Sequence, residues 1–146
     1  MQVVLDTNIT VSGLLWGGPP RQIMDAARAG KLQVFTSIDL LEELEDVLAR
    51  SKLAVRLQLV GKTASALLEE YSVLTTIVAA PPLAEPVSRD PDDDVVLACA
   101  LAAQAEAIVS GDADLLVLGS YRGIPILTAP ELLARLSSPA TPNVEG

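Results

Sequence analysis

The chain has 146 residues, a length typical of one folded domain that can bury a full hydrophobic core. It carries 10 basic and 19 acidic residues, and this net charge of −9 argues against a protein that coats nucleic acid with a large basic surface. It has no histidine, which excludes Ser-His-Asp and Cys-His mechanisms and histidine-bound metals. The predicted core is aliphatic, because half of the residues are hydrophobic and only four are aromatic.

The single cysteine, Cys99, lies in an apolar stretch and has neither a second thiol nor a histidine with which to share a metal. We therefore expect it to pack as an inert core residue. The longest uninterrupted hydrophobic run, Val95–Ala103, is too short to span a bilayer, and no basic and apolar leader opens the chain. These features predict a cytoplasmic protein.

The first informative stretch is Val3–Leu5, three consecutive apolar residues that predict a short strand buried on both faces, as in a parallel sheet. Asp6, Thr7 and Asn8 follow it directly. Ligands of open α/β sheets bind outside the carboxyl ends of the strands, so these three residues are candidates for the floor of a site. Taken alone, the same residues are equally well explained as a turn that caps a helix.

The next segments alternate between helix and strand. Ile9–Trp16 is followed by a Gly-Gly-Pro-Pro break, which predicts a helix with proline in its first turn that runs to about Ala29. Gly30 is placed to end this helix in the left-handed conformation, and Lys31–Thr36 then reads as a second strand.

Ser37 is predicted to cap a helix with an apolar stripe made of Leu40, Leu41, Leu44, Val47 and Leu48. Glu43 borders this stripe, three residues after Leu40 and four before Val47. Periodicity alone leaves its role open and favours an ordinary solvated glutamate, because edge positions of amphipathic helices are usually polar.

The middle of the chain predicts helix from Ser51 to Leu74 with a break near Gly61. Leu74–Val78 is β-prone and fits an edge strand or a short inner strand, and the proline-containing Ala79–Pro86 reads as a loop. No linker divides the chain, so we expect one domain over residues 1–136 and a frayed, disordered tail over residues 137–146.

A second informative stretch, Asp90-Pro91-Asp92-Asp93-Asp94, begins a nearly all-apolar helix. Helix capping and the helix dipole explain Asp90 and Asp92 well. Asp94 precedes Leu97, Ala98 and Leu101 by three, four and seven residues, so it is expected to face the interior, where a carboxylate is costly unless it is paired or bound to metal. We therefore favour a functional role for Asp94, and the pattern leaves Asp93 undecided.

A third acidic stretch follows the short predicted strand Ala107–Ser110, and it contains Asp112 and Asp114. Gly-Asp is also common turn chemistry, yet the order of strand and then acid repeats that of Asp6. Gly123–Thr128 predicts a last strand, at the edge because of its proline, and a Thr-x-x-Glu capping box starts a final helix. The alternation of strands and helices predicts an α/β/α sandwich on a mostly parallel sheet.

Together these segments resemble a known family. LDTN and VSGL near the N-terminus, then LLEELEDVL, DPDDDVVLACALA, IVSGDADLL and GIPILT, are similar in kind and order to the motifs of PIN domains, above all the PIN-type toxins of toxin-antitoxin systems. Each motif is weak by itself, but their order is specific, and the resemblance covers the chain to about residue 136.

The resemblance implies a metal-dependent ribonuclease in which Mg²⁺ or Mn²⁺ is held by Asp6, Glu43, Asp94 and Asp112. It further implies Asp93 and Asp114 as auxiliary ligands and Thr7, Asn8, Ser12 and Ser110 as supporting polar groups. The implied partners are RNA, a cognate antitoxin and a second copy of the chain. Hard carboxylate oxygens suit Mg²⁺, so a histidine-free cluster of acids is consistent with this chemistry.

Two other classes of function remain open on the sequence. A phosphatase or phospho-acceptor domain also places aspartates at strand ends, although Asn8 stands where an Asp-x-Asp phosphatase has its second acid. A catalytically silent interaction protein could use the same acids to bind a basic partner.

Overall fold

A computed structural model describes residues 1–137, and a six-stranded sheet lies at its centre in the order β3-β2-β1-β4-β6-β5. Its strands are β1 (Gln2–Leu5), β2 (Gln33–Thr36), β3 (Thr76–Ile77), β4 (Ala107–Val109), β5 (Ser120–Tyr121) and β6 (Ile124–Leu127). Within the described residues, all neighbouring strands run parallel except β5 and β6, which form an antiparallel hairpin.

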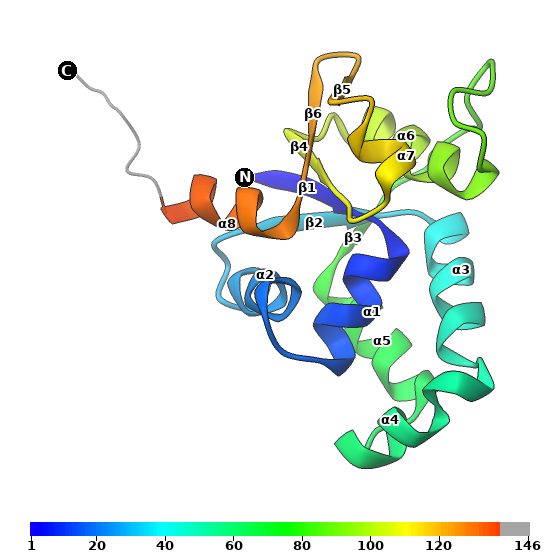
Figure 1. The fold of residues 1–146 in the computed structure, drawn as a ribbon, viewed down its shortest axis with the longest axis vertical. Helices are drawn as coiled ribbons and strands as arrows, with labels where there is room; N and C mark the ends of the chain where they lie inside the picture. Colours follow the sequence, from blue (N-terminus) through cyan, green and yellow to red (C-terminus); the bar gives the residue numbers. More distant parts are fainter. Residues whose placement is uncertain (138–146) are drawn as a thin grey trace.

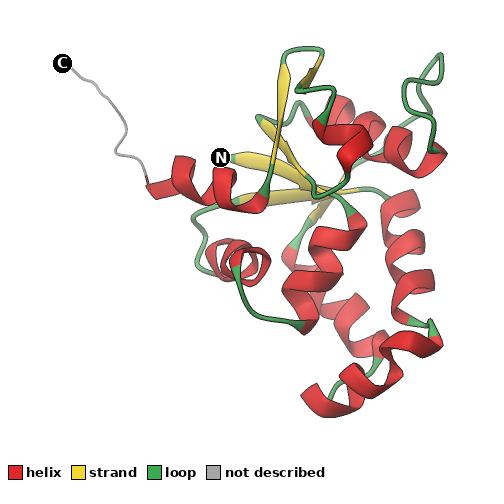
Figure 2. Ribbon diagram, viewed as in Figure 1, coloured by secondary structure: helices red, strands yellow, loops and turns green. Residues whose placement is uncertain are grey.

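Helices cover both faces of this sheet (Figures 1 and 2). They are α1 (Thr7–Leu15), α2 (Pro19–Arg28), α3 (Ile38–Leu48), α4 (Ala54–Val60), α5 (Ala64–Leu74), α6 (Pro91–Ala103), α7 (Ala113–Leu116) and α8 (Ala129–Ser137), with a 3-10 turn at Ser51–Leu53. In Figure 1, α6 and α7 lie above the sheet, and α1, α2 and α5 lie below it. The predicted α/β/α sandwich is confirmed.

The hydrophobic core is divided into two clusters by the sheet. Val3 and Leu5 of β1 belong to the cluster shared with α1, α2, α5 and α8, whereas Val4 belongs to the cluster shared with α6. This alternation explains why three consecutive apolar residues occur in β1, because each face of the strand is buried against a helical layer. Helix α3 packs at the boundary, with Leu40 in one cluster and Leu44 in the other.

The sheet order creates a crevice at one place. From β1, the chain crosses through α1 and α2 to β2 on one side, while β4 lies on the other side, so the direction of winding reverses between β1 and β4. In open α/β sheets this reversal is where ligands bind, outside the carboxyl ends of the two strands. The backbone N–H of Asp6 donates to the Val109 carbonyl at 3.0 Å, which holds these two strand ends together.

The local signals at helix ends are confirmed. Gly30 has φ +76° just after α2, and the hydroxyl of Ser37 accepts the Leu40 N–H at the start of α3. Asp90 accepts the Asp92 N–H and Pro91 is the first residue of α6. At α8, Thr128 and Glu131 exchange the hydrogen bonds of a capping box.

The C-terminal part of the chain differs from the expectation at β6 and at the end of α8. Strand β6 is not the edge of the sheet, because the two-residue strand β5 folds back along it and Ile126 donates its N–H to Gly119 O at 2.9 Å. So short a strand has no periodicity from which it could be predicted. Helix α8 continues through Ser137, and the rest of the expected tail, residues 138–146, lies outside the described residues.

Cys99 lies on the buried side of α6, and burial raises the pKa of its thiol to about 11, so the thiol is protonated and inert at neutral pH. Over the described part of the chain, no helix is long and apolar enough to cross a membrane.

Candidate functional site

A cavity of about 190 Å³ lies in the crevice at the carboxyl ends of β1 and β4. Six acids from four segments line it, together with one arginine and a few other side chains. The lining residues are Asp6, Thr7, Asn8, Glu43, Val47, Arg50, Asp90, Asp92, Asp93, Val96 and Asp112. We call this space the acid cavity. Its walls bring together residues that lie more than 100 positions apart in the sequence.

Asp6 forms the floor of the acid cavity and is buried. One carboxylate oxygen accepts the Ile9 N–H at 2.8 Å and so caps α1, and the other accepts the hydroxyl of Ser110 at the end of β4. Burial raises the pKa of the Asp6 carboxyl, and these hydrogen bonds offset part of that rise. The two hydrogen bonds therefore fix the orientation of the Asp6 carboxylate, but they offset only part of the free-energy cost of burying its negative charge.

Glu43 enters the acid cavity from α3, so tertiary structure decides the role that periodicity left open. The Thr7 hydroxyl donates to Glu43 Oε1 at 2.7 Å, which ties α3 to the start of α1. Burial raises the pKa of the Glu43 carboxyl, and the charges of Asp92 and Asp6 raise it further. Glu43 is thus a half-buried member of the acid cluster rather than a solvated surface residue.

The structure places the two adjacent acids of α6 differently from the expectation, which favoured a role for Asp94 and left Asp93 undecided. Asp93 is buried and lines the acid cavity, where it accepts the Ser88 hydroxyl at 2.9 Å. Asp94 lies outside that cavity, and its carboxylate accepts the backbone N–H groups of Val87 and Ser88 at 3.1 and 2.8 Å. Asp94 therefore anchors the loop before α6 and does not line the acid cavity.

The surroundings of these two acids in the sequence of α6 do not distinguish them. The positions three, four and seven residues after Asp93 are Val96, Leu97 and Ala100, which are as apolar as those that follow Asp94. Because α6 is buried on several sides, the spacing of its apolar residues does not predict which of the two acids faces the acid cavity.

Three carboxylates in the acid cavity come close enough to share a cation. Asp90, Asp93 and Asp112 each have one carboxylate oxygen within 4.8 Å of the others. Asp112 is positioned by Ser110, whose oxygen accepts the Asp112 N–H at 2.9 Å while its hydroxyl donates to Asp6. Ser110 thus links two of the acids.

The remaining expected site residues divide into two groups. Thr7 and Asn8 line the acid cavity, whereas Ser12 does not. Asp114 is half-buried outside that cavity and forms an ion pair with Arg89 at 3.1 Å. Asp90 and Asp92 also line it, although the sequence pattern explained both as capping residues. A helix N-terminus attracts acids for either reason, so the pattern held no separate signal for them.

The electrostatics of the acid cavity favour a bound cation. Burial raises the pKa of Asp93 to about 6, with further increases from the negative charges of Asp112 and Asp90. At neutral pH the buried acids are therefore ionised at a cost, which a divalent cation would offset. The donors are all hard oxygens, the set preferred by Mg²⁺ and Mn²⁺, so the residues present fit such an ion.

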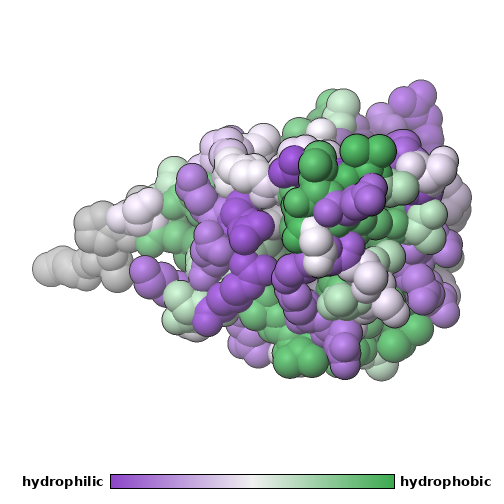
Figure 3. All heavy atoms as spheres, turned by 90° about the horizontal axis from the view of Figure 1, so that it is seen from below, coloured by the Kyte–Doolittle hydropathy of each residue, from purple (hydrophilic) through white to green (hydrophobic). Residues whose placement is uncertain are grey.

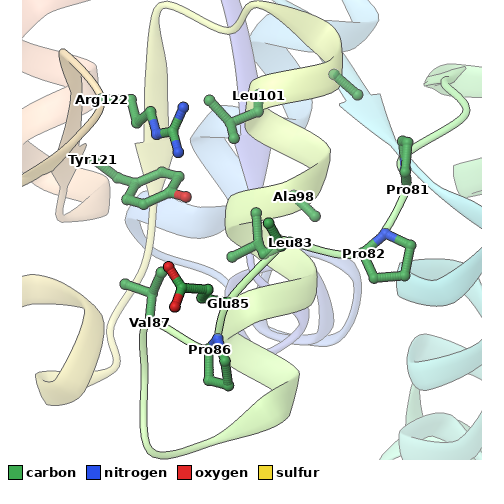
Figure 4. Close-up of a pocket in the computed structure, with 12 residues that line it drawn as sticks. Pro81, Pro82, Leu83, Glu85, Pro86, Val87, Ala98, Leu101, Tyr121 and Arg122 are labelled. Carbon is green, nitrogen blue, oxygen red and sulfur yellow. The ribbon is translucent and has the colours of Figure 1, made fainter.

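A larger cavity, of about 530 Å³, lies elsewhere, between the loop at residues 81–87 and α6 (Figure 4). Ala98 and Leu101 form its helical wall, and Tyr121 and Arg122 close one side. Among the described residues, the charged side chains that line it are those of Glu85 and Arg122, which form no cluster of acids. Of these two cavities, the smaller one therefore holds the groups suited to catalysis.

Comparison with known proteins agrees with this architecture. A family model described as a PIN domain matches residues 2–114. No curated protein matches the chain. Among solved structures, the crystal structure of VapBC2 from Rickettsia felis bound to a DNA fragment from their promoter contains a chain that is similar in fold, with a TM-score of 0.57 and 15% sequence identity. The similarity covers 86% of this chain and 97% of that chain.

Proposed function

Because the chain belongs to the PIN-domain family, we propose that it is a metal-dependent endoribonuclease that hydrolyses RNA phosphodiester bonds and acts as the toxin of a toxin-antitoxin pair. The observation that carries the proposal is the convergence of six acids in one cavity at the switch point of the sheet. Three of their carboxylates lie within 4.8 Å of one another, which supports a shared divalent cation.

In this proposal Mg²⁺ or Mn²⁺ is held by Asp90, Asp93 and Asp112, whose carboxylates approach one another most closely, together with Asp6 and Glu43 of the same cavity. A bound divalent ion neutralises charge on the scissile phosphate and lowers the pKa of a coordinated water. The protein contributes orientation. Ser110 and the Ile9 N–H hold Asp6, Thr7 holds Glu43, and Ser88 holds Asp93.

The other parts of the proposal concern partners and place of action. We infer a cognate antitoxin, a homodimer and a cytoplasmic location, all of which stay predictions. Exposed apolar side chains support protein partners, since Val55 and Leu59 on α4 are 67% and 72% exposed. The face seen in Figure 3, on which α4 lies, shows hydrophobic atoms among hydrophilic ones.

The proposal is tested with a pair of matched variants on α3. Glu43→Gln removes one anionic oxygen ligand from the acid cavity, and we expect it to lower kcat/KM for Mg²⁺- or Mn²⁺-dependent RNA cleavage about a hundredfold or more. Glu42→Gln makes the same chemical change one residue away, on the exposed side of the helix, and should cleave like wild type. Circular dichroism confirms that both variants fold.

A second matched pair examines α6. Asp93→Asn should lose cleavage as Glu43→Gln does, whereas Asp94→Asn should keep most of it because Asp94 lies outside the acid cavity. Wild-type cleavage by folded Glu43→Gln and Asp93→Asn proteins would overturn the proposal. Chelation of divalent metal should abolish cleavage by the wild-type protein. A phosphorylated form of the protein, trapped during the reaction, would indicate a phosphatase and not a nuclease.

A further inference from the structure

Helix α3 and the residues just after it connect the acid cavity to solvent through Arg50. Glu43, Val47 and Arg50 are spaced by four and then three residues, so they project from one side of the helix, and all three line the acid cavity. Glu43 is half-buried, Val47 is buried and Arg50 is exposed. This order places Arg50 at the mouth, where the Arg50 N–H extends the last turn by donating to Val47 O at 3.1 Å.

Within the part of the chain that the structure describes, the charge of Arg50 is not paired with an acid. Of the described residues that line the acid cavity, Arg50 is the one basic residue, beside six acids. Even so, within residues 1–137 its guanidinium makes no ion pair, unlike Arg89, which is paired with Asp114. An arginine side chain has five N–H donors in a planar fork, and those of Arg50 have no carboxylate partner in the described structure.

We propose that Arg50 binds a phosphate of the RNA strand as it enters the acid cavity, and that it sets the affinity for substrate rather than the rate of cleavage. This inference rests on the proposed function. A strand that approaches six acids is repelled, and a cation at the mouth reduces that repulsion and attracts phosphate. The guanidinium fork matches two phosphate oxygens, and a phosphate contact makes binding independent of base sequence.

The kinetic test compares Arg50→Gln, Arg50→Lys and the control Lys52→Gln. Lys52 is exposed, lies two residues further on and is absent from the cavity lining, so its replacement removes the same charge from the neighbouring surface. We expect Arg50→Gln to raise KM about tenfold on RNAs of different sequence while kcat changes less than about twofold. Arg50→Lys should be intermediate because it keeps the charge but not the fork. Lys52→Gln should resemble wild type.

A binding test separates phosphate contact from a structural role. In a Glu43→Gln background that blocks cleavage, the affinity for a short fluorescent RNA is measured by anisotropy over a range of salt concentrations. Arg50→Gln should reduce the slope of log K against log salt by about 0.7, the value for one phosphate contact on a single strand. Arg50→Lys and Lys52→Gln should leave the slope unchanged.

Each outcome decides the inference. Unchanged KM and salt slope in Arg50→Gln overturn it, and so does an equal effect from Lys52→Gln. A lower melting midpoint without metal, with RNA binding unchanged, also overturns it and makes Arg50 a partner of the acids. If the wild-type protein binds RNA but does not cleave it, the proposed function fails while the salt slopes still decide the role of Arg50. If it does not bind RNA, both are overturned.

Discussion

Asp93 and Asp94 are neighbours with the same side chain and opposite surroundings. Asp93 is only 6% exposed and lies among other carboxylates, with a pKa raised to about 6, mainly by burial. Asp94 accepts two backbone N–H groups that have no other acceptor within the described chain. At neutral pH, ionised Asp93 therefore lowers the stability of the metal-free fold, whereas Asp94 increases it.

We expect Asp93 to make the stability of the metal-free protein depend on pH. Its folded pKa, about 6, exceeds the ordinary 3.8, so the stability it contributes is fully present below pH 3.8 and is lost as pH rises through 6. The loss corresponds to at most about 3 kcal/mol. In urea unfolding with chelator present, Asp93→Asn should therefore be more stable than wild type at pH 7, with a difference that disappears near pH 4.

Asp94→Asn is the control for this measurement, and its effect has the opposite sign. The amide keeps one acceptor oxygen but loses the charge that strengthens the bonds to Val87 and Ser88, so stability at pH 7 should fall by about 1 kcal/mol. If Asp94→Asn is instead the stabilised variant, the assignment of the two acids is reversed.

At the scale of elements, the packing of α1 against α2 matters for the site, because Asp6 caps α1 and so moves with that helix. Gly13 lies at this helix contact. A Cβ at position 13 would be 2.8 Å from Met24 Cγ and 2.8 Å from Pro20 O, and the second of these is backbone that cannot rotate away. The close approach requires glycine here despite its low helix propensity.

Gly13→Ala is therefore expected to destabilise the protein by about 1–3 kcal/mol, although alanine favours helix, because the overlap forces α1 and α2 apart. Urea unfolding measures the change. Gly17→Ala, in the connection between the same two helices, meets no atom within 4 Å and should change stability by less than about 0.5 kcal/mol. Equal effects of the two substitutions would show that the contact at Gly13 is not tight.

At the scale of the whole molecule, the acid cavity joins segments from both helical layers, so a bound ion should stabilise the entire fold. Asp6 lies at the start of α1 and Asp93 lies in the first turn of α6 on the opposite face, while Glu43 is on α3 at the boundary. Their shared repulsion disappears when a cation binds.

We expect Mg²⁺ or Mn²⁺ to raise the melting midpoint of the wild-type protein. Binding to the folded state alone contributes about 2.7 kcal/mol at a hundredfold excess over Kd, which corresponds to roughly 5 °C or more for a chain of this size. Differential scanning fluorimetry at pH 7 measures the shift, with NaCl of matched ionic strength as control. Asp93→Asn should start higher without metal and respond less. An unchanged wild-type midpoint would contradict a metal site in the acid cavity.

The sequence by itself determined most of the longer helices and strands and several of their ends, because those signals are local. Asp90 before Pro91, Gly30 after α2 and the Thr128–Glu131 box each act within four residues, and the structure has them as predicted. Asp6 and Asp112 could also be singled out, since each follows a strand whose end faces the crevice.

The family resemblance already named Glu43 as a ligand, but only the tertiary structure decided which side chains line the acid cavity with Asp6 and Asp112. The Thr7 hydroxyl and the packing of α3 beside α1 hold the Glu43 carboxylate in the acid cavity. Asp93, and not Asp94, lines the acid cavity. Helix α6 is buried on several sides, so the spacing of its apolar residues does not predict which acid faces the cavity. Packing against the sheet and the loop that Asp94 anchors decide it. Arg50 reaches the mouth only because α3 runs along the cavity. Local preferences act over a few residues, whereas this site depends on contacts across more than 100, and those form only when the strands take their order in the sheet.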